Sequence, residues 1–238
     1  NTATAVTRRV YLTGGNPFAL SADALIEVFD EVERRIPSVK SYGGFCRISD
    51  IARKSDDDLA RLAARGVSGV TIGAESGFDE ALAFMEKGHT AHDIIEQAQR
   101  LHDADIPFTF FYLTGIAGAG HGQENALASA EVFSKAAPER ILVVTMTPSP
   151  GWPLAADIEA GRWAPPTEVE MAEEIRTFIA SLTCKTFVNC SHDTDILRFE
   201  GMVPLNQAKM IELMDHQIPK MNEKAARRMR EALHKAPF

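Results

Sequence analysis

Glycine and polar residues follow several short apolar runs of the sequence, where they could contact a ligand. Gly14, Gly15 and Asn16 come directly after the apolar run 10–12 and before a helix that we expect from Ser21. Glycines at the carboxyl end of a strand let a ligand approach the main chain closely. Ligands of parallel α/β sheets and barrels bind at that edge. A Gly-Gly pair taken alone is also consistent with an ordinary turn from strand to helix.

Two charged residues are candidates for chemistry at the same edge. Glu75 follows an expected strand over 67–73 and has glycines on both sides, so it could bind a ligand or be a solvated loop acid or helix cap. Lys87 lies at the end of a short helix, where a cation also complements the helix dipole. A barrel hydrolase or aldolase that uses both residues is a further alternative, although a Schiff-base lysine usually needs burial.

Metal-ligand patterns are weak in this sequence. The acidic run 56–58 opens a helix, where the dipole favours acids, so it is interpreted as a cap. His89 and His92 have no third ligand nearby and are interpreted as surface residues. The cysteines form no CxxC or CxxxCxxC pattern, which predicts free core thiols. These three cysteines are Cys46, Cys184 and Cys190.

Composition places the chain among ordinary soluble globular proteins. It has 238 residues, of which 45% are hydrophobic and 24% charged, enough for one large domain. The net charge of −8 argues against attraction to nucleic acid or a membrane surface. The sequence shows neither an apolar run of membrane-spanning length nor a signal peptide, so we expect a cytoplasmic protein.

Expected strands and helices alternate along the chain, which is typical of an α/β fold with parallel βαβ units. A barrel or partial barrel is favoured over a doubly wound sheet, because it needs no reversal of strand order. Strands are expected near residues 10, 42, 70, 110, 143 and 187. Helices are expected over 21–36, 79–86, 90–104 and 123–136, from 55, within 154–182 and from 206.

The ordered strand ends together resemble those of radical S-adenosylmethionine (SAM) enzymes, in particular the coproporphyrinogen-oxidase and Elongator-subunit branch. The segments that carry the resemblance are 13–17, 72–77, 85–90, 112–115 and 150–154. The resemblance implies a partial (β/α)6 TIM-like barrel that lacks the first strand. It assigns residues 1–155 to this barrel and 156–238 to a C-terminal helical extension packed on it as one domain.

The resemblance also implies a SAM site at these strand ends. Gly14, Gly15 and Asn16 match the family's GGE-type segment, which binds the methionine amino group. Asn16 stands where an acid or threonine is commoner, and the backbone carbonyls remain available there. Glu75 matches the residue that reaches the SAM ribose. Lys87 matches the cation that pairs with the methionine carboxylate, a strong charge-assisted contact.

Four more residues are expected near SAM on the same resemblance. Arg47 and Ser49 lie near a contact made by the family's third strand. Tyr112 and Leu113 lie where its fifth strand approaches the adenine and ribose. No residue of the chain is assigned a catalytic role.

The implied activity is reductive cleavage of SAM to a 5′-deoxyadenosyl radical, of oxidoreductase or transferase type, with an external electron donor and an unidentified substrate. The CxxxCxxC loop that holds the family's [4Fe–4S] cluster is missing here, so we expect its ligands in a preceding segment and no activity from this fragment alone. The alternative is a cluster-free barrel that binds SAM or a nucleotide without radical chemistry. The candidates for facing a substrate are Tyr42, Arg47, His121, His192 and Asp195.

Overall fold

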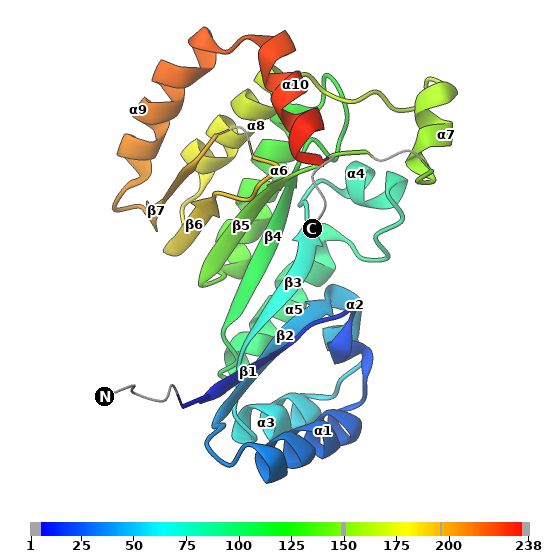
Figure 1. Ribbon diagram of the computed structural model, residues 1–238, viewed down its shortest axis with the longest axis vertical. Coiled ribbons are helices and arrows are strands. Elements are labelled where there is room, and N and C mark those ends of the chain that lie inside the picture. The colour runs from blue at the N-terminus through cyan, green and yellow to red at the C-terminus, as the bar shows by residue number, and fades with distance from the viewer. Residues whose placement is uncertain (1–5, 149–150, 196, 235–238) are drawn as a thin grey trace.

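A seven-stranded sheet in which strand order follows chain order forms the centre of the molecule (Figure 1). The computed structural model describes residues 6–148, 151–195 and 197–234. Strands β1 to β6 are parallel, and β7 pairs with β6 in the antiparallel sense. The strands are β1 (Arg9–Leu12), β2 (Ser41–Arg47), β3 (Val67–Glu75), β4 (Phe108–Thr114), β5 (Arg140–Thr145), β6 (Thr186–Cys190) and β7 (Phe199–Val203).

The six predicted parallel strands are confirmed, and the sheet is an open partial barrel. Strand β7 was not expected from the sequence. Pro150, which belongs to the segment 150–154 noted above, lies outside the described residues.

Helices connect successive strands, and several begin at serine or threonine caps. The side chains of Ser21, Ser55, Thr90 and Thr167 each accept a hydrogen bond from a backbone N–H in the first turn, which satisfies a donor that the helix itself leaves free. The short helix α2 was not predicted. The helices are η1 (Pro17–Ala19), α1 (Ala22–Arg35), α2 (Ile48–Ala52), α3 (Asp56–Ala64), α4 (Asp79–Phe84), α5 (Ala91–Asp103), α6 (Gly122–Ala136), α7 (Leu154–Glu159), α8 (Glu168–Ser181), α9 (Gln207–Gln217), η2 (Ile218–Lys220) and α10 (Glu223–His234).

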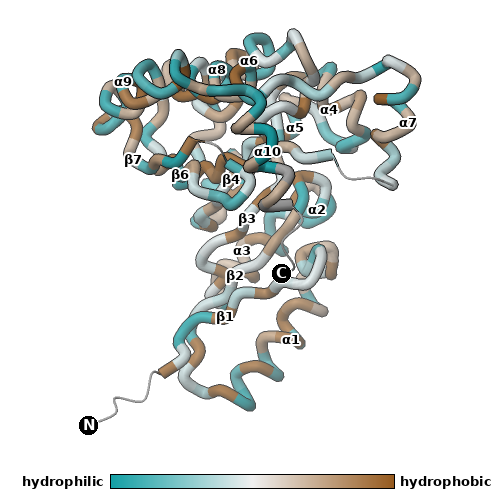
Figure 2. The backbone as a smooth tube through the Cα atoms, turned by 45° about the horizontal axis from the view of Figure 1, so that its top comes forward, coloured by the Kyte–Doolittle hydropathy of each residue, from teal (hydrophilic) through white to brown (hydrophobic). Residues whose placement is uncertain are grey.

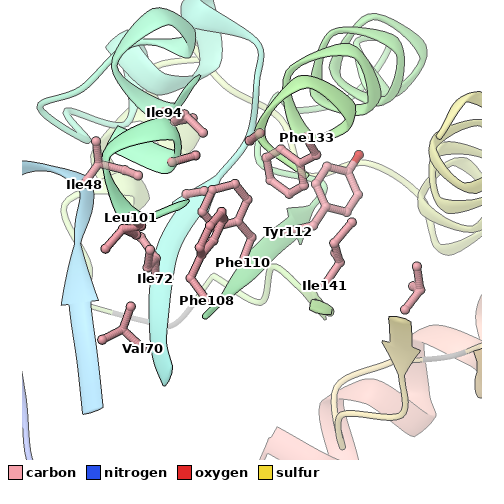
Figure 3. Close-up of a cluster of buried hydrophobic side chains, with 14 of the residues drawn as sticks. Ile48, Val70, Ile72, Ile94, Leu101, Phe108, Phe110, Tyr112, Phe133 and Ile141 are labelled. Atoms are coloured by element: carbon pink, nitrogen blue, oxygen red, sulfur yellow. The ribbon is translucent and has the colours of Figure 1, made fainter. Parts of the chain in front are cut away.

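Alternating side chains give the sheet a helix side and an open face. On β4, Phe108, Phe110 and Tyr112 are buried against the helices, in the core shown in Figure 3. Figure 2 shows the matching alternation along α1, whose hydrophobic positions include the buried Leu25 and Phe29. Each such side chain contributes roughly 1.5–3 kcal/mol through burial.

The open face carries the residues of opposite parity and is only partly buried. It includes Tyr11, Phe45, Thr71 and Phe111. The rings of Tyr11 and Phe45 meet edge to face at 5.4 Å, and those of Phe45 and Phe111 lie 6.2 Å apart. The open face of β1, β2 and β4 therefore carries an aromatic surface.

The last helix returns to the carboxyl ends of the parallel strands. A side-chain oxygen of Glu223 accepts the backbone N–H of Glu168 at 2.8 Å. The Arg230 guanidinium donates to the Met146 carbonyl at 2.8 Å and lies 2.6 Å from the Glu168 carboxylate. Helix α10 is thus anchored beside the end of β5. Among the helices that the structure describes, none combines the length and the apolar composition of a membrane span.

Candidate functional site

The predicted site residues follow neighbouring parallel strands and so gather at one edge of the sheet, here called the carboxyl edge. Gly14 and Gly15 follow β1 with φ values of 86° and 120°. Residues other than glycine rarely adopt such backbone angles. A Cβ atom at either glycine would meet no atom within 4 Å. The glycines are therefore needed for backbone conformation, and they leave the main chain open to a ligand.

Asn16 carries an unsatisfied acceptor beside this open backbone. It precedes the 3-10 helix η1, and its side chain makes no capping hydrogen bond. Its Oδ1 atom is buried and has no hydrogen-bond partner. A buried polar atom without a partner costs about 1–3 kcal/mol. A ligand with an N–H donor, such as an ammonium group, would satisfy it.

Glu75 ends β3 in a strained backbone conformation. Its φ is 69°, a left-handed value that costs a residue with a side chain roughly 1–2 kcal/mol. A Cβ atom on Gly73 would lie 2.7 Å from the Glu75 Oε1 atom, so Gly73 leaves room for the carboxylate on the open face. Strained residues cluster at functional sites.

Lys87 and His89 join the loop after α4 to the end of β3. The Lys87 Nζ atom lies 3.9 Å from the Glu75 Oε2 atom. The His89 ring lies 3.2 Å from the carbonyl oxygens of both Ala74 and Lys87. His89 therefore links the backbone of Lys87 to that of Ala74, next to Glu75, and so helps to keep the ion pair together. The sequence had suggested an ordinary surface residue.

Arg47 and Ser49 lie at the same edge, where Arg47 ends β2 and Ser49 lies in α2. Arg47 is exposed and precedes α2, and its backbone N–H donates to the Asp50 carboxylate at 2.8 Å. Ser49 is half-buried in the first turn of α2. Their contact with SAM stays a prediction.

Tyr112 and Leu113 sit at the end of β4 with their side chains on opposite faces. Tyr112 pairs with Glu75 across the sheet, but its side chain is fully buried on the helix side, beside Phe133 (Figure 3). Its ring stacks on Phe178 at 3.9 Å. Burial and the nearby Glu174 carboxylate raise the pKa of Tyr112 well above its usual value. The Tyr112 ring is therefore turned away from the open face, and contacts by the half-buried Leu113 stay a prediction.

Two of the suggested substrate-facing residues are buried, which corrects that expectation. The Tyr42 ring is fully buried and stacks on Phe29 at 3.9 Å. Asp195 is buried and accepts hydrogen bonds from the Thr145 hydroxyl at 3.0 Å and the His192 N–H at 2.9 Å. Burial raises the pKa of Asp195 to about 6.

Glu174 is a buried acid behind the carboxyl edge that the sequence reasoning missed. Burial raises the pKa of its side chain to about 7, although hydrogen bonds oppose the shift. A signal was available: Glu174 stands on the apolar face of α8, three residues after Met171 and four before Phe178. A charged residue in that position is seldom buried without a partner.

The cysteines are free, as predicted. Cys46 and Cys190 are buried, and Cys184 is half-buried. Burial raises the pKa of all three thiols. In the part of the chain that the structure describes, no group of three His, Cys, Asp or Glu residues could hold a metal ion.

Comparison with known proteins points to one superfamily. A family model described as "Radical SAM superfamily" matches residues 2–126, just over half of the chain. No curated protein matches the sequence.

Solved structures share the fold at low sequence identity. Archaeal Elp3 from Methanocaldococcus infernus, with an N-terminal deletion, is 16% identical, with a TM-score of 0.63 over 90% of this chain and 55% of its own. Methylornithine synthase (PylB) is 14% identical, with a TM-score of 0.55 over 88% of this chain and 56% of its own. Coproporphyrinogen III oxidase (HemN) from Escherichia coli is 13% identical, with a TM-score of 0.50 over 64% of this chain and 40% of its own. The chain thus spans about half the length of the first two.

Proposed function

This chain belongs to the radical SAM superfamily, and from that membership we propose that the carboxyl edge of its sheet binds SAM. The observation that carries the proposal is the buried, unpartnered Oδ1 atom of Asn16 beside two open glycines. The ammonium group of SAM is a donor of the kind this acceptor lacks. The strained Glu75 and the cation of Lys87 lie at the same edge.

Three groups of SAM have a complementary residue in this proposal. Asn16 and the backbone of Gly14 and Gly15 accept from the methionine ammonium. Lys87 pairs with the methionine carboxylate, and Glu75 accepts from ribose hydroxyls. With one electron from the external donor, SAM held by these residues would supply the carbon radical chemistry that removes a hydrogen atom from a substrate.

The described residues do not fit an iron–sulfur cluster, which the superfamily also implies. Cys46 and Cys190 are buried, and the three thiols form no ligand group with other residues that the structure describes. No cluster ligand and no electron-transfer step is therefore assigned to them. The activity of the whole protein remains part of the proposal: an oxidoreductase or transferase acting in the cytoplasm with an external electron donor.

Variants at Asn16 test the SAM site directly. In the full-length protein, Asn16→Ala removes the acceptor, and hydrogen bonds to charged groups contribute about 1.5–3 kcal/mol. We therefore expect the SAM dissociation constant, measured by equilibrium dialysis, to rise at least about tenfold. Asn16→Asp keeps an acceptor and adds a charge opposite to that of the ammonium group, so its affinity should match or exceed that of the wild type. Wild-type affinity in Asn16→Ala would contradict the assignment.

The radical reaction needs a separate test on the full-length protein. Anaerobic iron–sulfur reconstitution, followed by an assay for 5′-deoxyadenosine with SAM and dithionite, should show cleavage of SAM. SAM binding without a cluster and without cleavage would instead support a barrel that binds SAM without radical chemistry.

A further inference from the structure

A chain of buried hydrogen bonds connects α8 to the carboxyl edge from behind. Glu174 is only 2% exposed, and its Oε1 atom accepts from the Tyr112 hydroxyl and the Asn125 side-chain amide, each at 2.7 Å. Its Oε2 atom lies 3.1 Å from the backbone N–H of Gly115. One carboxylate thus receives donors from β4, from the loop after β4 and from α6.

Asn125 extends this network to the turn after β3. Its amide group donates to Glu174 and its oxygen accepts from the Ser76 hydroxyl. The Asn125 side chain is thus oriented with its amide nitrogen toward Glu174 and its oxygen toward Ser76. The Ser76 oxygen in turn accepts the backbone N–H of Phe78 at 2.9 Å.

Helix α6 holds the same turn by direct contact. The backbone N–H of Gly77 donates to the Ser129 hydroxyl at 2.7 Å. A Cβ atom on Gly77 would lie 2.7 Å from the Ala128 carbonyl oxygen. The turn therefore rests on the helix backbone, and residues 76–78 have little freedom to move.

Glu75 immediately precedes this fixed turn. Its left-handed backbone needs support from the surrounding structure, because the conformation is unfavourable by itself. We propose that Glu174 is a positioning residue, which fixes the turn at 76–78 through Asn125 and so sets the place of the Glu75 carboxylate at the carboxyl edge. The inference rests on the proposed SAM site for its functional meaning.

Two substitutions in the full-length protein distinguish the hydrogen-bond geometry of the Glu174 side chain from its charge. Glu174→Gln keeps an acceptor oxygen for Tyr112 and Asn125, whereas Glu174→Leu removes both acceptors. We expect Glu174→Leu to weaken SAM binding about tenfold or more, by analogy with losses at residues that orient the ligands of metal sites. Glu174→Gln should restore most of this affinity, because it keeps the acceptor oxygen. Glu173→Ala, on the exposed side of the same helix, is the matched control and should bind as the wild type does.

Hydrogen exchange measured by mass spectrometry reports the positioning without any ligand. In Glu174→Leu, amides of residues 75–78 should exchange faster, while the control and Glu174→Gln should not differ from wild type. Asn125→Ala breaks the link between Glu174 and Ser76 without altering α8. It should also speed exchange in 75–78, which keeps the test valid if Glu174→Leu fails to fold.

The two proposals fail in different ways. A wild-type protein that does not bind SAM, but shows these exchange changes, would refute the SAM site and leave the structural coupling in place. Unchanged exchange at 75–78 in a folded Glu174→Leu or in Asn125→Ala, or wild-type SAM affinity in a folded Glu174→Leu, would overturn the positioning role.

Discussion

Replacement of Lys87 by methionine should separate SAM binding from folding. The Lys87 ammonium lies 3.9 Å from the Glu75 carboxylate, and their side chains are 29% and 22% exposed. Coulomb's law gives about 4 kcal/mol for this separation at an effective dielectric constant near 20. Exposure, desolvation and side-chain entropy reduce the net contribution of such pairs to about 0–1 kcal/mol. Lys87→Met should therefore lower the free energy of unfolding by less than about 1 kcal/mol.

The expected loss of SAM affinity is larger. A charge-assisted hydrogen bond to a carboxylate is worth about 1.5–3 kcal/mol, which corresponds to an increase of about 10- to 150-fold in the dissociation constant. Isothermal titration of the full-length protein with SAM measures it. The wild-type affinity should also fall with added salt more steeply than that of Lys87→Met, because salt screens an attraction that the variant lacks.

The matched control for this experiment is Lys135→Met. Lys135 pairs with Glu131 at 2.6 Å on the surface of α6, and both side chains are mostly exposed. Lys135→Met removes the same charge as Lys87→Met but does not alter the carboxyl edge, so SAM affinity should stay unchanged. Equal affinities for wild type, Lys135→Met and a folded Lys87→Met would refute the role given to Lys87.

Two further predictions concern buried acids. Because the pKa of Asp195 is raised to about 6 in the folded protein, folding stability should fall by up to about 3 kcal/mol as pH rises from about 4 through about 6. Asp195→Asn should lose this contribution and show a smaller decrease than the wild type when urea unfolding is compared at pH 4 and pH 8, and parallel pH profiles would contradict it. Arg230→Met leaves the fully buried Glu168 carboxylate without its cation and should lower the free energy of unfolding by about 3 kcal/mol or release α10. Adding Glu168→Gln should recover most of the loss in urea unfolding; no recovery would show that the pair is not the cause.

Sequence reasoning located the parallel strands because each is a short apolar run that stops at glycine or polar residues. The apolar character of these runs also prevented a prediction of which side chains of β4 point to the helix side. Residues 108–113 are apolar or aromatic at nearly every position, so alternation cannot distinguish the helix side from the open face. The resemblance therefore placed Tyr112 near a ligand, while the structure buries its ring beside Phe178.

Elements whose form depends on distant partners were harder to predict. Strand β7 is only five residues long, and its antiparallel pairing with β6 follows from a contact that local sequence does not encode. The network around Glu174 joins residues 49 to 62 positions apart in the chain. Its acid can be noticed on the apolar face of α8, but its partners require the folded structure.

The burial of the native thiols makes the protein suited to selective labelling. Cys46 and Cys190 are inaccessible and Cys184 is half-buried, and burial raises the pKa of each thiol, so few reactive thiolates are present near neutral pH. Met229 on α10 is 52% exposed and adjoins Arg230, which contacts the end of β5. A maleimide dye or spin label would therefore react first with the thiol of Met229→Cys. Such a probe would stand next to the carboxyl edge and leave every residue assigned to SAM untouched.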